Sequence, residues 1–334
     1  MPVPQAVEHL AGMQAQAPLA PYTGLWTRLQ DFTPDALTTP ISERLLLRAH
    51  LMRNTIHLVT APDYHDFAPL FTQLRERGLQ ANFGKLLPGI DIADLRTHAT
   101  AVLAGRELTR PELGKLLAGQ WPAADERALG HAAAHLVAMV HVPPRGIWGK
   151  SGQVRMARAD EYLGQPPPAQ PAALKRLVLR YLAAFGPATV NDIQAWSGLT
   201  RLREVTDRLT GQLRTFPGGL LDLPDAPRPD PDIPAPPRFL PEYDNLLLSH
   251  ADRTRVIPHN RPVPLPPGNG STQGTLLIDG QWNATWKLSA TALEITPFIP
   301  LPPPQMDAIT EEAATLLAFL TPPGAPRDIR FLPR

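Results

Sequence analysis

The sequence predicts an α+β protein in which small helical units, each closed by a β-hairpin, precede a β-rich C-terminal domain. Apolar residues at helical spacing alternate with short strand pairs as far as residue 224, and strand pairs dominate after residue 238. The prolines divide these segments from one another. Many of the 41 fall at residues 164–171, 224–237, 262–267 and 297–304. These clusters are expected to be extended connections, because proline lacks an N–H and disfavours helix in the residue before it.

The clearest unit spans residues 172–224 and predicts three short helices followed by a hairpin. The first helix has one apolar face, formed by Leu174, Leu177, Val178, Tyr181, Leu182 and Phe185. Thr189 and Thr200 are predicted to cap the second and third helices. Two strands then flank the glycines at 218 and 219. This order of elements is typical of a winged helix-turn-helix unit.

The same order predicts a second winged helix-turn-helix unit at residues 89–165. One helix is expected over residues 92–103, and a second opens with a capping box from Thr109 to Glu112. A third helix is expected over residues 124–139. Strands at 140–142 and 154–156 would flank the loop that forms the wing.

A less regular unit of the same kind is predicted at residues 1–88. Helices are expected over residues 6–13, 22–29, 41–47 and 62–77. Strands at 48–52 and 55–59 are predicted to pair across Arg53 and Asn54, because asparagine tolerates the left-handed turn conformation.

Residues 238–334 predict a small β-rich, barrel-like domain. Strands at 274–278 and 282–288 form a hairpin with Asp279 and Gly280 at its turn. Further strands are expected at 293–298 and 328–332, together with one helix at 307–320.

The composition excludes several kinds of protein. The 334-residue chain has no cysteine, which excludes disulfides and thiol chemistry, and its net charge of +1 gives no overall basic field for nucleic acid. No apolar run approaches the roughly 20 residues of a membrane span. The first residues lack the pattern of a signal peptide, so we expect a cytoplasmic protein. His131 and His135 lie four residues apart without a matching third ligand, and no metal or other cofactor is predicted.

Two glutamines, Gln14 and Gln16, stand at a junction between helical segments where apolar or turn-forming residues are usual. If this stretch is extended, both side chains point to one face and Ala15 points to the other. Each amide can accept and donate hydrogen bonds, so the pair can hold a water molecule. On the pattern alone, a pair of surface amides that cap a helix end is the competing interpretation.

Several segments, taken in order, resemble the AlkZ/YcaQ-like winged-helix DNA glycosylases, bacterial enzymes that unhook interstrand crosslinks. The segments are residues 7–16, 24–28, 51–59, 181–187, 240–245, 249–253 and 274–286. Their order and spacing carry the resemblance, which covers nearly the whole chain. It implies three tandem winged-helix units and a C-terminal β-domain.

The resemblance also implies a reaction. The family's catalytic motif is a glutamine, a usually apolar residue and a second glutamine, which implies Gln14 and Gln16 as catalytic residues. The implied activity is hydrolysis of the N-glycosidic bond of N7-alkylated purines, including bulky adducts and interstrand crosslinks, in double-stranded DNA. Such a base is cationic and leaves readily, so a positioned water can suffice. Family members usually carry about one more helix before the motif, and the first unit is therefore expected to be short at its N-terminus.

DNA contacts are expected from helices that enter grooves and from wings that touch the backbone. The candidates are Arg48, Arg53, His57, Arg145, Lys150, Arg155, Arg201 and Arg203. Any one of them can equally be a solvated surface charge. Three carboxylates, Glu242, Asp244 and Asp252, are expected to be structural groups at a domain junction rather than catalytic ones.

Two other functions compete with the glycosylase. One is a non-catalytic winged-helix DNA-binding protein, such as a regulator or a lesion sensor, and the other is a protein-interaction scaffold. We expect a monomer associated with the nucleoid.

Overall fold

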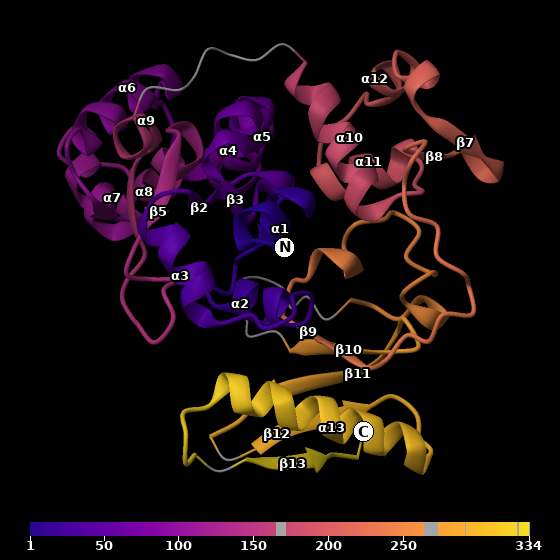
Figure 1. Cartoon of the computed structure of the whole chain (residues 1–334). Helices are drawn as coiled ribbons and strands as arrows, with labels where there is room; N and C mark the ends of the chain where they lie inside the picture. Colours follow the sequence, from indigo (N-terminus) through magenta and orange to yellow (C-terminus); the bar gives the residue numbers. More distant parts are fainter. Residues whose placement is uncertain (165–171, 264–272, 291, 326, 334) are drawn as a thin grey trace.

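The computed structural model describes residues 1–164, 172–263, 273–290, 292–325 and 327–333. The predicted connections at 164–171 and 262–267 lie largely outside these residues. Figure 1 shows the helix-rich part of the chain above and a separate C-terminal sheet below, with the N-terminus near the centre. Helices and three sheets occur together along the chain, which confirms the predicted α+β class.

A six-stranded antiparallel sheet is the framework of the N-terminal half, in the order β1-β3-β2-β5-β6-β4. Its strands are β1 (Met13–Gln14), β2 (Leu46–His50), β3 (Ile56–Thr60), β4 (Leu108–Thr109), β5 (Met139–Val142) and β6 (Arg155–Arg158). The pairing of β2 with β5 joins the first two predicted units. Hydrogen bonds therefore cross the boundary that was predicted between residues 88 and 89.

Five helices belong to the first part of the chain: α1 (Val3–His9), α2 (Ala20–Trp26), α3 (Pro34–Ser42), α4 (Ala61–Phe67) and α5 (Thr72–Phe83). The helices predicted at 6–13 and 41–47 were placed too far along the chain. Ala11 and Gly12 adopt positive φ angles of 51° and 93°, which end α1 and allow Met13 to begin a strand. Arg44, with φ of 62°, likewise ends α3 before Leu46 begins β2.

The predicted hairpin between β2 and β3 is confirmed. The two strands pair in register from Leu46 with Thr60 to His50 with Ile56. Arg53 and Asn54 both lie in the left-handed region, with φ of 53° and 56°. The turn thus places two successive side chains that contact different parts of the molecule.

Residues 92–163 supply α6 (Ile92–Leu103), α7 (Arg110–Ala118), α8 (Glu126–Leu136) and α9 (Ala159–Leu163). Both hydrogen bonds of the predicted capping box at Thr109 and Glu112 are present. The loop between β5 and β6 folds against α2. The Tyr22 hydroxyl donates to the Gly146 carbonyl and accepts from the Trp148 N–H, each at 3.1 Å.

Residues 173–222 form α10 (Ala173–Phe185), α11 (Val190–Ser197), α12 (Arg203–Asp207), β7 (Arg214–Phe216) and β8 (Leu220–Asp222), in the predicted order. Thr189 caps α11, as predicted, and Asp192 completes a capping box with it. Thr200 does not cap α12, because the residue at its N-cap position is Leu202. Side chains of α10 and α11, such as Tyr181 and Trp196, share one hydrophobic core with one face of the six-stranded sheet.

The C-terminal part is a five-stranded sheet in the order β13-β12-β11-β10-β9, with one helix against it (Figure 1). Its elements are β9 (Arg238–Leu240), β10 (Gly274–Ile278), β11 (Gln281–Leu288), β12 (Ala292–Pro297), α13 (Pro303–Leu320) and β13 (Asp328–Phe331). The hairpin turn at Asp279 and Gly280 is confirmed. Within the described residues the sheet is open, with β9 and β13 at its edges, so the barrel-like closure that we predicted is not seen.

Candidate active site

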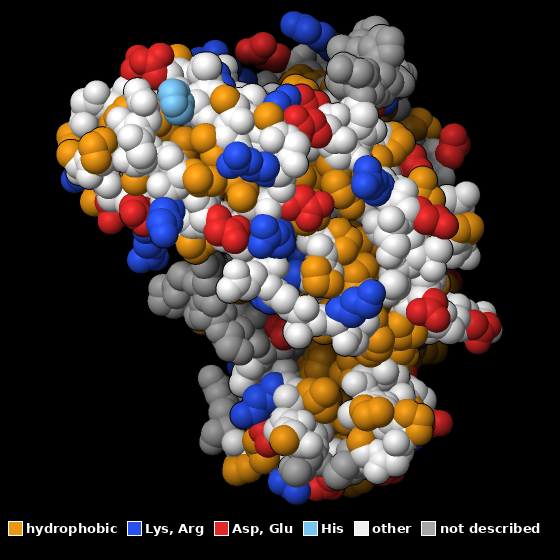
Figure 2. Space-filling model, turned by 90° about the vertical axis from the view of Figure 1, so that its left-hand side faces the viewer, with side chains coloured by type: hydrophobic (Ala, Val, Ile, Leu, Met, Phe, Trp, Pro, Cys, Tyr) orange, Lys and Arg blue, Asp and Glu red, His pale blue; other side chains and the backbone are white. Residues whose placement is uncertain are grey.

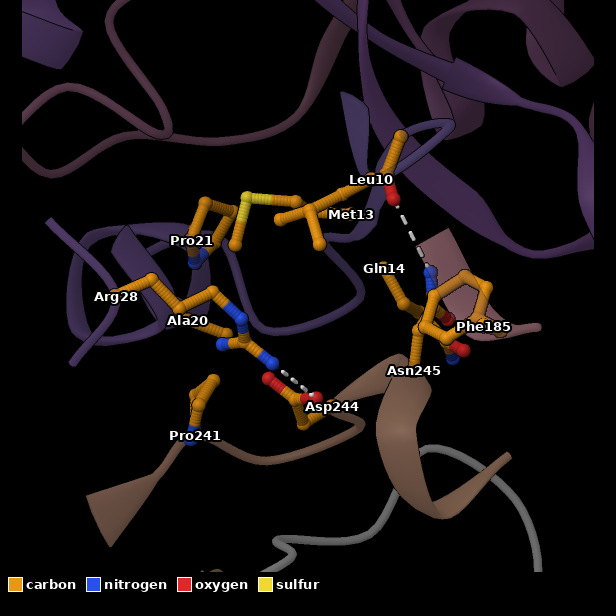
Figure 3. Close-up of a pocket in the computed structure, with 11 residues that line it drawn as sticks. Leu10, Met13, Gln14, Ala20, Pro21, Arg28, Phe185, Pro241, Asp244 and Asn245 are labelled. Carbon is orange, nitrogen blue, oxygen red and sulfur yellow. Dashed lines mark hydrogen bonds and ion pairs between the residues drawn. The ribbon is translucent and has the colours of Figure 1, made fainter. Parts of the chain in front are cut away.

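A pocket lies where the first part of the chain meets the end of α10 and the segment after β9 (Figure 3). Its cavity volume is about 20 Å³. The lining residues are Leu10, Gly12, Met13, Gln14, Ala20, Pro21, Arg28, Phe185, Pro241, Asp244 and Asn245. Three segments that are far apart in the sequence therefore form one site, and one of the predicted catalytic glutamines lies in its wall.

Gln14 is the last residue of β1 and pairs with His57 of β3. Because side chains alternate along a strand, Gln14 and His57 lie on the face that is covered by α10 and α11. Gln14 is only 7% exposed. Its Oε1 atom accepts a hydrogen bond of 2.6 Å from Nη2 of Arg53, which fixes the orientation of the amide.

Arg53 connects three parts of the chain around this glutamine. In addition to Gln14, its guanidinium donates to the carbonyl oxygen of Trp196 in α11, at 2.5 Å, and to Oδ1 of Asn245, at 3.0 Å. Asn245 in turn donates through Nδ2 to the Gly12 carbonyl oxygen, at 3.2 Å. Burial, with Arg253 nearby, lowers the pKa of Arg53 to about 10, so the side chain remains a cation at neutral pH. We call Gln14, Arg53 and Asn245 the glutamine network.

Gln16 lies just beyond the strand and is half-buried. Its Oε1 atom accepts from the backbone N–H of Ile56 at 3.3 Å, so the side chain extends the pairing with β3. Ala15 is fully buried in the core beneath α1–α3, on the opposite side from Gln14. The expected inward orientation of Ala15 is therefore observed. The Ala15 carbonyl oxygen accepts from Nη2 of Arg48 at 2.9 Å, which fixes the backbone between the two glutamines.

The acidic residue in the pocket wall is Asp244, which is held by local contacts. Its Oδ1 atom accepts from Nη2 of Arg28 and from the N–H of Leu246, each at 2.9 Å. Arg28 also donates to the Gly24 carbonyl oxygen. Sequence reasoning did not single out Arg28 or Asn245, although both lie in segments that carry the family resemblance.

Two of the predicted DNA contacts occupy interior positions, and a third is half-buried. Arg48 is 4% exposed and His57 is fully buried, while Arg53 is committed to the glutamine network. Burial and the nearby Arg53 lower the pKa of His57 to about 3, so the ring is neutral. Its Nδ1 atom lies 3.1 Å from the Thr55 carbonyl oxygen. The prediction that Arg48 and His57 lie on a DNA-facing surface is wrong, because both side chains are buried. For Arg53, a DNA contact stays a prediction.

The other predicted contacts lie at or near the surface. Lys150, Arg201 and Arg203 are exposed, and Arg145 is half-buried. Arg155 pairs with Glu112. Figure 2 shows Lys and Arg side chains distributed among acidic and apolar ones on one face of the molecule, without a continuous basic field. On this face, contacts with a polyanion would therefore depend on individual Lys and Arg side chains.

No metal site and no membrane span emerge from the described part of the chain. Its His, Asp and Glu side chains form no group of three that could hold a metal ion. His131 stacks on Phe83, with ring centroids 4.5 Å apart, rather than facing a third ligand. Among the helices of the described ranges, none is long and apolar enough to cross a bilayer.

Known proteins place this geometry in context. The fold is similar to that of the Streptomyces sahachiroi DNA glycosylase AlkZ, with a TM-score of 0.79. The two sequences are 20% identical, and the match covers 99% of this chain and 94% of that chain. A search of curated proteins finds no match.

The family comparison defines the class of protein. The model of the AlkZ-like DNA glycosylases matches residues 7–319, which include the whole glutamine network and the pocket around it. The protein is thus a DNA glycosylase. It belongs to the AlkZ-like family.

Proposed function

We propose that this protein is a monofunctional DNA glycosylase that releases N7-alkylated purines from double-stranded DNA, including bulky adducts and interstrand crosslinks. In this proposal, three winged-helix units at residues 1–88, 89–165 and 172–224 and a β-domain at 238–334 hold the duplex. The observation that carries the proposal is the Gln14 amide, which is held in the wall of the pocket by the half-buried Arg53.

Gln14 and Gln16 are the residues that we propose to position the attacking water. A carbonyl oxygen has two lone pairs, so Oε1 of Gln14 can accept from a water while Arg53 donates to it. The same holds for Oε1 of Gln16, which receives one bond from Ile56. A water held by these oxygens has its own lone pairs free for attack. Preorganised groups of this kind lower a barrier without moving during the reaction.

The reaction then requires little proton transfer by the protein. The bond between C1′ and N9 breaks, and its electron pair neutralises the purinium as the alkylated base leaves. The water oxygen bonds to C1′, and its proton passes to solvent. An uncharged purine would need an acid to leave, and Asp244, the carboxyl group in the pocket wall, is engaged with Arg28. The site therefore suits bases that are already cationic.

The size of the pocket favours substrates in which the base stays outside. Its cavity volume of about 20 Å³ is enough for a water molecule and far below that of a small-molecule site. The space suits a water and the edge of a sugar, whereas a bulky or tethered adduct cannot be flipped into a tight pocket. We therefore place the water, and not the damaged base, beside Gln14.

The test is base release from a duplex that carries one N7-methylguanine. Under enzyme excess, the abasic product is cut in mild alkali and resolved on a denaturing gel. We expect cleavage well above the enzyme-free rate. In a double variant, Gln14→Ala with Gln16→Ala, the rate of base release should fall at least about 100-fold. A duplex crosslinked through two guanine N7 atoms should be unhooked by the same preparation.

Each result decides between functions. Tight binding of damaged duplex without any base release would favour a lesion sensor or regulator over the proposed activity. Full activity in the double glutamine variant, with unchanged folding by circular dichroism, would show that other residues hold the water.

A further inference from the structure

A second group of polar side chains lies on the opposite face of the same sheet. We call His50, Arg110, His131, His135, His141 and Arg145 the basic cluster. His50 in β2 and His141 in β5 have ring centroids 6.0 Å apart, and His50 and His135 have centroids 6.1 Å apart. The cluster thus lies where the first and second parts of the six-stranded sheet join.

The location explains why the cluster is not covered by apolar residues. Side chains of α1–α3 cover the β1-β3-β2 end of this face, and those of α6–α8 cover the β5-β6-β4 end. The basic cluster occupies the strip between these two cores. His50, Arg110, His131, His135 and Arg145 are half-buried there, so the strip is open to solvent.

Several nitrogen atoms in the cluster lack partners. The His141 side chain is only 8% exposed, and both of its ring nitrogens are buried without a hydrogen bond among the described residues. The Nε atoms of Arg110 and Arg145 are also buried without a partner in the described ranges. The Arg110 side chain makes no hydrogen bond or ion pair to any described residue. An unmade hydrogen bond at a buried group costs about 1–3 kcal/mol, so this arrangement is unfavourable in the isolated protein.

The cluster also lacks counter-ions. In the described part of the chain, no Asp or Glu carboxylate bonds or forms an ion pair with any of its six members. Arg48 and Arg75 lie beside the cluster and add further positive charge. The negative charge of Glu76 favours the charged form of Arg75. Burial lowers the pKa of His50 to about 3 and the pKa of His135 to about 4, and Arg110 and Arg75 add to both shifts, so both rings are neutral. A neutral imidazole still donates one N–H.

Unpaired hydrogen-bond donors, together with cations that have no carboxylate partner, are typical of an anion-binding site. We propose that the basic cluster binds one phosphate group of the DNA backbone, with Arg110 and His141 as its principal donors. A phosphate oxygen accepts several hydrogen bonds at once and neutralises an arginine. The inference rests on the proposed function, because it takes DNA as the bound substrate.

The hairpin between β2 and β3 connects this phosphate site to the glutamine network. Asn54 at the turn lies 3.4 Å from Nδ1 of His135, through its Nδ2 atom, and the preceding residue, Arg53, holds Gln14. A strand anchored at the basic cluster would therefore have a fixed position relative to the pocket. The phosphate contact would fix the position of the DNA strand along its backbone, and it would not recognise any base.

The test measures binding of an undamaged 20-base-pair duplex by fluorescence anisotropy over a range of KCl concentrations. We compare wild type, Arg110→Met, and the double variant Arg110→Met with His141→Leu. At the lowest salt we expect a Kd about tenfold higher in the double variant, and a slope of log Kd against log salt that is smaller by about one. Because His141→Leu removes unpaired buried nitrogens, its thermal midpoint should not fall.

The matched control is Arg158→Gln, which removes one positive charge from the same sheet. Arg158 is paired with Asp160 and Glu161, so its loss should change Kd by less than about twofold. If Arg110→Met and the double variant fold and bind DNA like this control, the proposal is wrong. Should the double variant fail to fold, the comparison of Arg110→Met with Arg158→Gln decides alone.

Two further arms separate the sources of phosphate and the two proposals. In the first arm, inorganic phosphate is added to wild type and to Arg110→Met. If phosphate raises the thermal midpoint of wild type only, while the slope of log Kd for DNA against log salt is the same in both proteins, the cluster binds free anions. That result would overturn DNA binding at the cluster. Base release at saturating enzyme concentrations should be unchanged in the control variant Arg158→Gln. Failure of base release in wild type would instead count against the glycosylase mechanism while leaving the binding test intact.

Discussion

The two faces of the six-stranded sheet carry polar groups in opposite states. On one face, the polar atoms of the glutamine network bond to each other and to backbone carbonyl oxygens, and α10 and α11 cover them. On the other face, the basic cluster has donors without acceptors and cations without carboxylates. One hairpin turn contacts both, through Arg53 on the first face and Asn54 on the second.

This difference indicates two kinds of function. Polar groups that are satisfied internally hold a fixed geometry, as a site that positions water needs. Polar groups that are unsatisfied in a low-dielectric position are unfavourable until a ligand arrives, as a binding site needs. Variants on the first face should therefore reduce the rate of base release, and variants on the second should reduce affinity for DNA.

The largest effect should come from Arg53→Met, which removes the centre of the glutamine network. Gln14, Asn245 and the Trp196 carbonyl oxygen would each lose a hydrogen bond, so the Gln14 amide would no longer be fixed. We expect the single-turnover rate of base release to fall at least about 100-fold. Stability measured by urea denaturation should also fall, by about 2–4 kcal/mol.

A rate loss could reflect unfolding alone, and Asn245→Ala separates the two causes. It removes one bond to Arg53 and leaves the bond from Arg53 to Gln14. We expect an intermediate loss of about tenfold. Equal rates for wild type and Arg53→Met, in protein that is folded, would contradict the positioning role.

Acid should destabilise both faces through their neutral histidines. The pKa of His50 and of His57 is about 3 in the folded protein, below the usual value of about 6.5 in an unfolded chain. Between these values the unfolded state binds more protons, so stability is lost as the pH falls from about 6.5 towards 3. We expect the thermal midpoint to be clearly lower at pH 5 than at pH 7.5. Replacing His57 by Gln should reduce that difference; midpoints that do not change with pH would contradict the buried, neutral rings.

A smaller effect is expected for Asp244→Asn. The substitution keeps an acceptor for Arg28 and Leu246 but removes the negative charge. If Gln14 and Gln16 position the water, base release should fall less than about tenfold. A loss as large as that of the double glutamine variant would make Asp244 the general base and would revise the mechanism.

The smallest effects should come from exposed arginines of the third part of the chain. Arg201→Ala and Arg203→Ala each remove one exposed cation near α12. Each should raise Kd for DNA only about two- to threefold, uniformly across sequences, and leave base release at saturation unchanged. A larger effect than that of Arg110→Met would place the main phosphate contact at α12 instead of in the basic cluster.

Local sequence signals predicted most of the elements. The capping boxes at Thr109 and Thr189 and the turn at Asp279 and Gly280 involve neighbouring residues, so their chemistry is visible in the sequence. The strand at Met13 was missed because it has two residues and depends on β3, more than 40 residues away. Pairing of this kind leaves no local pattern.

The candidate site was predicted in part for the same reason. The sequence indicated Gln14 and Gln16 through their family resemblance, and Ala15 as the residue between them that turns inwards. It could not indicate that Arg48 and His57 are interior, because a basic residue on a hairpin looks the same whether the hairpin is exposed or covered. The partners Trp196 and Asn245 come from distant segments.

The shared sheet also bears on how the chain folds. Since β2 hydrogen-bonds to β5, and β4 closes the far edge, residues 13 to 158 complete one cooperative unit. Neither half has its full set of strand partners until the other has been synthesised, and contacts of such long sequence separation form slowly. The backbone amides at the β2–β5 seam should then be among the last to exchange with deuterium. The two polar sites would persist through smaller local openings, because both are built beside that seam.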